Sequence, residues 1–509
     1  MTDRLFEGLL TDNRAPSQAN HGTVSEFTRR GRRTFIFCAI DNCMHQHVDW
    51  RDVAWVTIDM LPDVALLEIF DYHVHASWIG VEAWHTLVHV CRKWRNVVFG
   101  SPRRLDLRLY CKATTPVREM LDVWPLLPIV IRFYGDNMLG IDNIIAALEH
   151  NDRICELALL DIPSSQFEKV LAVMHRPFPA LTHLDLQPTG EMATVVPASF
   201  LSGSTPLLQT LWLDCVPIQG LSKILLSTTH LVRLNLLRIP YSGYISPEAM
   251  VSCLSVLTGL ERLDIGFKSP QCRPDRGHRH PPPLTRTLLP ALSKLWFKGV
   301  GEYLEDLVAR IDAPLLDKLG ITFFHQLMFD TPQLTQFISR TPNFKALDKA
   351  RVVFSNRDVW ITLPRSSDGA LELAISCRPS DWQLLSLAQV CSSSFPRALI
   401  STVEHLYILD KGTWDWQDDI ENIHWLELLH PFTAVKNLYI SWEFVLRTTP
   451  ILKELAGERV TEVLPSLQTL FLEEPLRVPS GPVQEAIRQF VATRQLAGHP
   501  VTISRWNGW

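Results

Sequence analysis

Apolar residues recur through the middle and the end of the chain in one spaced pattern. The pattern reads L-x-x-L-x-L, with Ile, Val or Phe at some of the leucine positions. Alternate side chains of a strand point to opposite faces, so this spacing predicts a short strand whose apolar side faces a core shared with its neighbours. The ten copies begin at Ile154, Leu181, Leu208, Leu231, Leu260, Leu292, Leu316, Val403, Val435 and Leu467.

The segments between these predicted strands complete a repeating unit. Residues 247–257, for example, place their apolar side chains at helical spacing. Most copies begin 23 to 32 residues after the previous one. One strand plus one helix every 20–29 residues or so is the leucine-rich-repeat pattern, and several of the spacings here are longer. The Asn or Cys that usually follows the strand is mostly missing, so the repeats are degenerate. A unit this small cannot bury its apolar face alone, and the units must therefore stack.

The predicted fold class is thus α/β, a leucine-rich-repeat-like solenoid of strand-plus-helix units with a curved parallel sheet. Unrelated strands within an ordinary α/β domain are the alternative, because Leu-x-x-Leu by itself is common. Between the copies at Leu316 and Val403, a gap of 87 residues could hold about three divergent units, and Leu371–Ile375 alternates like a strand. Two stretches are expected to be loops, the proline-rich 269–283 and the acidic 410–419 with its two tryptophans.

A different pattern occupies residues 58–101. Pro62 and Asp63 suit the first turn of a helix, and residues 64–70 are mostly apolar. Residues 84–98 again place apolar side chains at helical spacing, with basic residues on the other side. A helical unit this small exposes apolar surface unless a partner covers it, which favours a docking module over an enzyme.

The same stretch resembles a known domain. Leu-Pro at 61–62, Ile-Phe at 69–70 and Val-Cys-x-x-Trp at 90–94 together resemble an F-box. With its degenerate leucine-rich tail, the chain from 58 to 505 is similar to the large F-box protein families of mushroom-forming (basidiomycete) fungi. It departs from the F-box pattern between Phe70 and Val90, where the connection is longer than usual.

The resemblance implies a role in protein degradation. An F-box binds the Skp-type adaptor of a cullin–RING ubiquitin ligase, and through it the cullin, while the repeat array selects a protein substrate. On this resemblance, the residues that bind the adaptor or pack the three helices are Leu61, Pro62, Leu67, Ile69, Phe70, Leu87, Val90, Cys91 and Trp94. The chain then divides into an N-terminal segment of unknown structure (1–57), the F-box (58–102), a linker or first irregular repeat (103–150) and the degenerate repeat domain (151–505).

Charge and composition narrow the range of partners. Lys and Arg number 49 against 54 Asp and Glu, and the net charge of −5 gives no overall attraction to nucleic acid or to an anionic membrane. No apolar run approaches the length of about 18 residues that a membrane span needs, and the N-terminus lacks the apolar core of a signal peptide. The ten Cys are scattered and do not suggest a disulfide framework. These features predict an intracellular protein, in the cytoplasm, the nucleus or both.

Motifs for catalysis or ligand binding are weak or missing. Cys38, Cys43, His45 and His47 are zinc-type ligands, but their spacing does not fit a zinc finger. The stretch 299–304 begins like a nucleotide-binding loop, but leucine replaces its third glycine. The sequence carries no P-loop, serine-hydrolase, zinc-protease or kinase motif. We therefore expect no enzymatic activity, no cofactor and no metal ion.

Nucleic acid is not an expected partner either. The basic stretch 92–108 could be interpreted as a phosphate-binding strip, but it lacks interleaved aromatic residues, and the polar side of an F-box helix explains the same residues. The leading hypothesis is a substrate-recognition subunit of a Skp–cullin–F-box ligase. The alternatives are a leucine-rich-repeat scaffold for protein interactions that recruits no ligase, and an α/β enzyme with an unrecognised pocket.

Overall fold

The computed structural model describes most of the chain beyond residue 59. The described residues are 60–76, 83–112, 116–135, 140–190, 195–272, 285–324, 329–345, 347–365, 369–377, 380–411, 423–441, 452, 462–473 and 481–506. They form two compact units, one that ends at Asp106 and one that begins at Leu107. The predicted N-terminal segment 1–57, with its zinc-type ligands, lies outside the described residues, and so do most of the two predicted loops.

The first unit consists of three helices, α2 (Asp63–Ala76), α3 (Ala83–Val88) and α4 (Arg92–Gly100). Its core contains Phe70 and Trp84, which are 0% and 1% exposed, and the ring of Phe70 lies 4.7 Å from that of Trp94. The first helix is longer than the predicted 64–70, so part of the expected connection after Phe70 is helical.

The apolar stretch 84–98 forms two helices rather than one continuous helix. Cys91 separates them because its backbone is extended, and its Sγ accepts a hydrogen bond from the backbone N–H of Trp94 at 3.5 Å. Cys91 is therefore the N-cap of α4 and satisfies one of the donors that a helix start leaves open. Helical spacing continued across the break, so the spacing alone did not reveal it.

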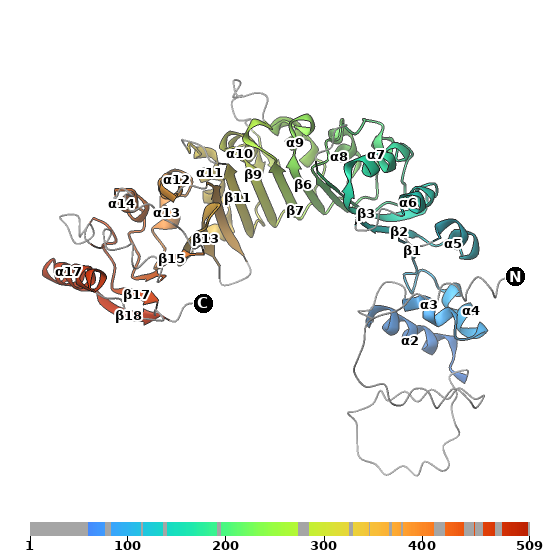
Figure 1. The fold of residues 1–509 in the computed structure, drawn as a ribbon, viewed down its shortest axis with the longest axis horizontal. Coiled ribbons are helices and arrows are strands. Elements are labelled where there is room, and N and C mark those ends of the chain that lie inside the picture. The colour runs from blue at the N-terminus through green and yellow to red at the C-terminus, as the bar shows by residue number, and fades with distance from the viewer. Residues whose placement is uncertain are drawn as a thin grey trace, which may run out of the picture. The chain divides into compact units, whose positions relative to one another are not determined.

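The second unit is built on one long sheet of sixteen strands (Figure 1). Neighbouring strands are parallel except around β13. In sheet order the strands are β1 (Leu109–Cys111), β2 (Ile129–Tyr134), β3 (Ile154–Pro163), β4 (His183–Thr189), β5 (Thr210–Asp214), β6 (Arg233–Ile239), β7 (Arg262–Phe267), β9 (Lys294–Gly299), β11 (Lys318–Phe324), β14 (Ala370–Ser376), β13 (Asp358–Pro364), β12 (Lys349–Phe354), β15 (His405–Asp410), β16 (Asn437–Ile440), β17 (Thr469–Glu473) and β18 (Thr502–Trp506). Two short strands, β8 (Thr287–Leu288) and β10 (Ile311–Asp312), pair separately.

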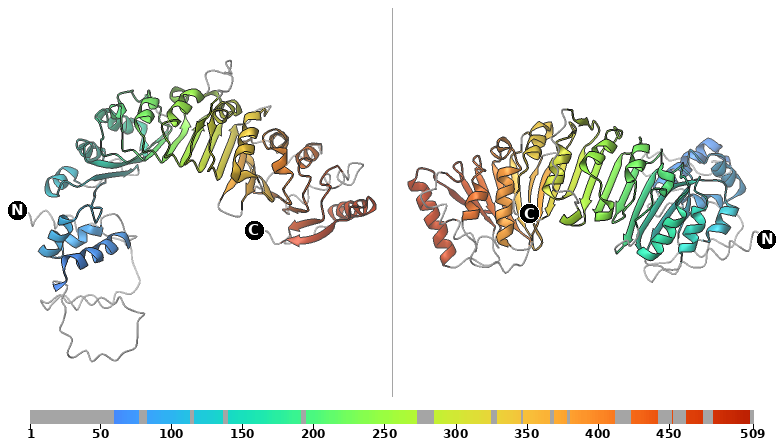
Figure 2. Two further views of the ribbon diagram at one scale, coloured as in Figure 1. Left: turned by 180° about the vertical axis from the view of Figure 1, so that it is seen from behind. Right: turned by 90° about the horizontal axis from the view of Figure 1, so that it is seen from above.

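Helices connect most pairs of successive strands and lie along one side of the sheet (Figures 1 and 2). We call the opposite side the open face, because no described helix of this unit covers it. The helices of this unit are α5 (Val117–Val123), α6 (Ile141–Leu148), α7 (Ser164–Val173), α8 (Leu221–Ser227), α9 (Pro247–Leu254), α10 (Gly301–Val308), α11 (Pro332–Arg340), α12 (Ser380–Ser393), α13 (Arg397–Ile400), α14 (Ile423–Leu429) and α17 (Pro482–Leu496). This alternation of strand and helix confirms the predicted α/β solenoid.

Each of the ten sequence copies provides a strand. Nine of these strands begin at the third position of their copy, and β3 begins at the first position, Ile154. The first apolar residue of the copy is buried, as at Leu181 and Leu260. The backbone N–H groups of Gln209 and Thr210 both donate to the carbonyl of Thr182 in the preceding unit, at 2.8 and 3.0 Å. The same paired hydrogen bond recurs at the carbonyls of Gln209, Val232, Glu261, Ser293, Asp348, Glu404 and Lys436. The repeated bond holds the units in a common register.

The gap between the copies at Leu316 and Val403 contains three strands, but they are not three strand-plus-helix units. β12, β13 and β14 form an antiparallel meander, and the sheet order across it is β11-β14-β13-β12-β15. The sheet remains continuous because β14 pairs with β11, and β12 with β15, in parallel. The predicted strand at Leu371–Ile375 is the centre of β14.

Buried polar side chains link the helices of neighbouring units. The carboxylate of Glu305 on α10 is 8% exposed and accepts hydrogen bonds from the backbone N–H groups of Gln333 and Leu334, at 2.9 and 2.7 Å. These donors belong to the first turn of α11, where backbone N–H groups have no partner within the helix. Arg310, 6% exposed, forms an ion pair with Glu248 of α9 at 3.0 Å. Three consecutive helices are thus joined by side chains as well as by apolar packing.

Replacing the carboxylate that caps α11 tests this linkage. Glu305→Ala removes the acceptor of the N–H groups of the half-buried Gln333 and the buried Leu334, so we expect it to lower the free energy of unfolding by about 2 kcal/mol or more. Glu302→Ala, at an exposed position of the same helix, serves as the control and should change the stability by less than about 1 kcal/mol. Urea unfolding followed by circular dichroism measures both changes. Equal midpoints for the two variants would contradict the role given to Glu305.

Candidate functional site

The first unit places the nine residues predicted from the F-box resemblance in two settings. Four of them, Leu67, Phe70, Leu87 and Trp94, are buried and pack the helices together. Another four are half-buried, Leu61, Ile69, Val90 and Cys91, and Pro62 is exposed. The sequence pattern did not separate these two settings, and the structure now does.

Apolar side chains at the start of α2 point away from the core of the first unit. Met60 is 69% exposed and Val64 is 65% exposed, and Pro62 lies between them in the chain. The backbone beside them is fixed, because the Nζ of Lys93 on α4 donates to the carbonyl of Leu61 at 2.7 Å. We call residues 60–64 the exposed apolar segment. The sequence analysis did not single out Met60 or Val64. A signal for Val64 was present, because it is four residues before the charged Glu68 and therefore lies on the same, solvent-exposed face of the helix.

Four basic side chains follow one another across the open face of the second unit. They lie on the adjacent strands β6, β7, β9 and β11, and the register pairs each with the next (Figure 1). Arg233 is exposed and the other three are half-buried. We call this set the basic row: Arg233, Arg262, Lys294 and Lys318.

The row could have been found in the sequence by aligning the repeats. All four residues occupy the third position of their copy of L-x-x-L-x-L. Parallel strands in a common register bring equivalent positions side by side. When four consecutive copies have a cation at the third position, the four side chains therefore form one continuous row. In the next units on either side, the same register position is held by Thr210 and Ala370, which carry no charge.

Two residues further along these strands, on the same face, lie polar and aromatic side chains, which include Asp264 and Trp296. Arg262 donates three hydrogen bonds to Asp264 on its own strand, with Nε–Oδ1 at 3.2 Å, Nε–Oδ2 at 3.0 Å and Nη2–Oδ2 at 2.7 Å. Burial raises the pKa of the Asp264 carboxyl, and its hydrogen bonds to Arg262 oppose that rise. The pair fixes the direction of the Arg262 side chain, while Arg233 and Lys294 make no ion pair with any described residue.

Trp296 lies flat on the open face beside the basic row. A Cβ atom placed on Gly320 of the neighbouring strand would be only 1.9 Å from Cε3 of the indole and 2.1 Å from Cζ3. The glycine therefore leaves the space that the ring occupies. Trp296 keeps 36% of its surface exposed, so it offers an aromatic platform to a partner.

Glu372 of β14 occupies the register position next to Gly320, on the side away from Trp296. Its side chain is half-buried, and no hydrogen bond or ion pair joins its carboxyl to another described residue. Burial raises the pKa of this carboxyl above the ordinary value of a glutamate. Asp185 on β4 is also half-buried, and its pKa is also raised. Because β4 lies beyond one end of the basic row and β14 beyond the other, a carboxyl group lies past each end.

Further along the open face, aromatic rings replace charges. Tyr407, Tyr439 and Phe471 lie in register on β15, β16 and β17, and their rings stack with centroids 4.2 and 4.4 Å apart. Burial, the largest cause, together with Tyr439 raises the pKa of Tyr407 to about 12. This aromatic ladder packs within itself, so we assign it to the stability of the last units.

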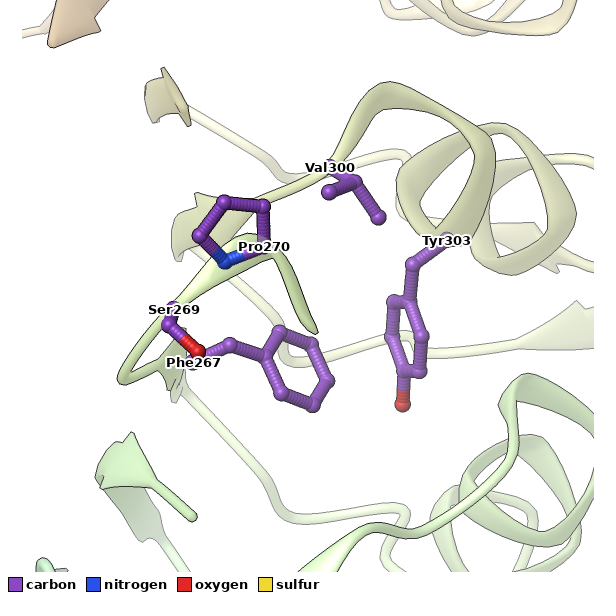
Figure 3. Close-up of a pocket in the computed structure, with 5 residues that line it drawn as sticks. All are labelled: Phe267, Ser269, Pro270, Val300 and Tyr303. Carbon is purple, nitrogen blue, oxygen red and sulfur yellow. The ribbon is translucent and has the colours of Figure 1, made fainter. Parts of the chain in front are cut away.

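Two of the hollows among the described residues differ greatly in size. The space in Figure 3, lined by Phe267, Tyr303, Val300 and Pro270 among others, has a volume of about 10 Å³, room for a single water at most. The figure shows the two rings side by side, and the hydroxyl of Tyr303 donates to the carbonyl of Ile245 at 3.2 Å. A larger hollow of about 420 Å³ lies between α7 and residues 195–200, and most of its lining is apolar.

No group of three or more His, Cys, Asp or Glu residues is arranged to hold a metal ion in the part of the chain that the structure describes. None of the described helices is long and apolar enough to cross a membrane.

No family model matches the sequence, and no curated protein matches it. Among the solved structures, the chain is similar to the leucine-rich repeat-containing protein LegL7 from Legionella pneumophila, at 12% identity and a TM-score of 0.27, over 75% of this chain and 97% of that one. At so low a TM-score the likeness supports no conclusion, so the solenoid assignment of the second unit depends on its own sheet order and burial.

The pH dependence of stability tests the environment of Glu372. Because its pKa is raised in the folded protein, the folded state binds the proton more tightly than the unfolded state, and stability falls as the pH rises above the ordinary glutamate pKa. Glu372→Gln should therefore be more stable than the wild type at pH 7, with a smaller difference at about pH 4. Glu119→Gln, at an exposed position of α5, is the control and should show no such trend. A Glu372→Gln variant less stable than the wild type at pH 7 would contradict the assignment.

Proposed function

We propose that this protein is the substrate-recognition subunit of a Skp–cullin–F-box ubiquitin ligase. The first unit would bind the Skp-type adaptor, and the open face of the second unit would bind the protein to be ubiquitinated. The observation that carries the proposal is the exposed apolar segment, residues 60–64, on a three-helix unit whose sequence resembles an F-box. Such a protein acts inside the cell, in the cytoplasm, the nucleus or both.

The packing of the first unit supports a docking role. Its buried residues already form the core, so the exposed Met60, Pro62 and Val64 contribute nothing to that core. Burying two such side chains against a partner is worth about 1.5–3 kcal/mol each. The hydrogen bond from Lys93 to the carbonyl of Leu61 holds the segment in place before binding, which lowers the entropy lost on association.

The second unit supports a binding role rather than a catalytic one. Its open face presents side chains from many strands at a fixed spacing, as repeat proteins do when they bind extended protein surfaces. The proposed contribution of this chain to ubiquitin transfer is proximity, because it would hold the target near the charged conjugating enzyme. No cofactor or metal ion is part of the proposal.

Capture of the adaptor tests the proposed function. The full chain, tagged at its C-terminus, is co-expressed with a Skp-type adaptor, and recovery of the adaptor is compared between the wild type and Met60→Glu/Val64→Glu. Charges placed in the segment would have to be desolvated on docking, so we expect recovery to fall by about tenfold or more.

The matched control is Leu126→Glu, which places a charge at an apolar residue that is 85% exposed in the second unit. It should leave recovery unchanged, and all variants should show the circular dichroism spectrum of the wild type. Equal recovery from the wild type and the double variant, or no recovery from either, would reject the ligase proposal. The latter result would favour a scaffold that recruits no ligase.

A further inference from the structure

We propose that the basic row and Trp296 bind a short, carboxylate-rich segment of the target protein. The inference rests on the target-binding half of the proposed function and specifies the chemistry of the target. It concerns the open face of β6, β7, β9 and β11 and does not depend on the first unit.

The charge of this part of the open face favours an anionic partner. The basic row contributes four cations, and the exposed Lys298 at the other end of β9 adds a fifth. Among the open-face positions of these four strands, Asp264 is the one carboxylate, and it is bonded to Arg262. Arg233 and Lys294 have no ion-pair partner among the described residues, so carboxylates of a partner would meet cations that are not already neutralised.

The length of the row limits the size of its ligand. Neighbouring strands lie about 4.8 Å apart, so four strands place the outermost cations about 14 Å apart. An extended peptide advances about 3.3 Å per residue, so a segment of about five residues crosses the row. Side chains on one face of that peptide repeat every two residues, which allows two or three carboxylates to face the basic row at once.

Trp296 gives the site an apolar contact next to the charges. The indole lies in the space that Gly320 leaves free. Trp296 is two residues after Lys294 on β9, so the two side chains are on the same face of the sheet. An apolar side chain within the acidic segment would cover the indole and exclude water from the neighbouring ion pairs. Desolvation strengthens such ion pairs, and a central aromatic contact is typical of residues that dominate binding.

A peptide fits the surroundings of the row better than a nucleic acid does. A polyanion that continued past the row would approach Asp185 on one side and Glu372 on the other. The basic row itself ends at the uncharged Thr210 and Ala370. The surface therefore matches a short anionic stretch in a longer chain, which is what an acidic segment of a protein provides.

The test uses the purified full chain and a fluorescein-labelled peptide of eight residues with four glutamates around one leucine. Fluorescence anisotropy at low salt should give saturable binding that weakens as salt rises. Arg233→Glu/Lys294→Glu should weaken the affinity by about tenfold or more. The control Lys169→Glu/Arg176→Glu makes the same charge change at exposed residues on and just after α7, and its affinity should stay within about twofold of the wild type.

A second variant tests the aromatic contact without changing any charge. Gly320→Val fills the space under the indole and must displace the ring. It should lower the affinity for the leucine-containing peptide by about threefold or more. The affinity for a peptide with alanine in place of leucine should not change. The thermal unfolding of each variant is measured alongside, so that a loss of folding is not mistaken for a loss of binding.

Several results would overturn the inference. They are no binding of the acidic peptide by the wild type, equal affinities for the two charge-reversal double variants, and no effect of Gly320→Val on the leucine-containing peptide. Tighter binding of a single-stranded oligonucleotide or of a phosphoserine peptide of equal charge would also overturn it. Adaptor capture by the same preparations reports on the first unit, so failure of the peptide site and failure of the ligase proposal are distinguished.

Discussion

The second unit depends on one constraint: no strand-plus-helix unit of this chain can bury its apolar face except against its neighbours. The first apolar residue of each copy is buried, as at Leu231 and Leu292. Paired backbone hydrogen bonds between neighbouring units, as at the carbonyls of Gln209 and Val232, then hold their strands in a common register. Because the register is fixed, equivalent positions of successive copies form rows on the open face. The basic row is a direct consequence of the packing that stabilises the solenoid.

The two sides of the sheet carry different kinds of polar interaction. On the helix side, polar groups are buried and satisfied by neighbouring units, as with Glu305 at the start of α11 and Arg310 with Glu248. On the open face, Arg262 is paired with Asp264, whereas Arg233 and Lys294 have no described ion-pair partner. The half-buried carboxyl of Glu372 has no described partner either. These three unpaired side chains are therefore available to a partner.

The sequence predicted the strands well because their signal is local. All ten copies of the pattern became strands, and the predicted strand around Leu373 is present as well. The meander of β12 to β14 was not predicted, since alternation of apolar residues is the same for parallel and antiparallel strands. The break at Cys91 was hidden because helical spacing continued across it. The basic row was missed because its members are 24 to 32 residues apart, and only the shared third position connects them.

In the proposed function, the chain has two separate binding units, one for an adaptor and one for a target. The most direct measurement is the affinity of the full chain for the acidic peptide, determined without the Skp-type adaptor and with the adaptor at saturation. We expect the same dissociation constant in both cases and a ternary complex that contains the chain, the adaptor and the peptide. Displacement of the peptide by the adaptor, or an adaptor complex that no longer binds the peptide, would contradict it.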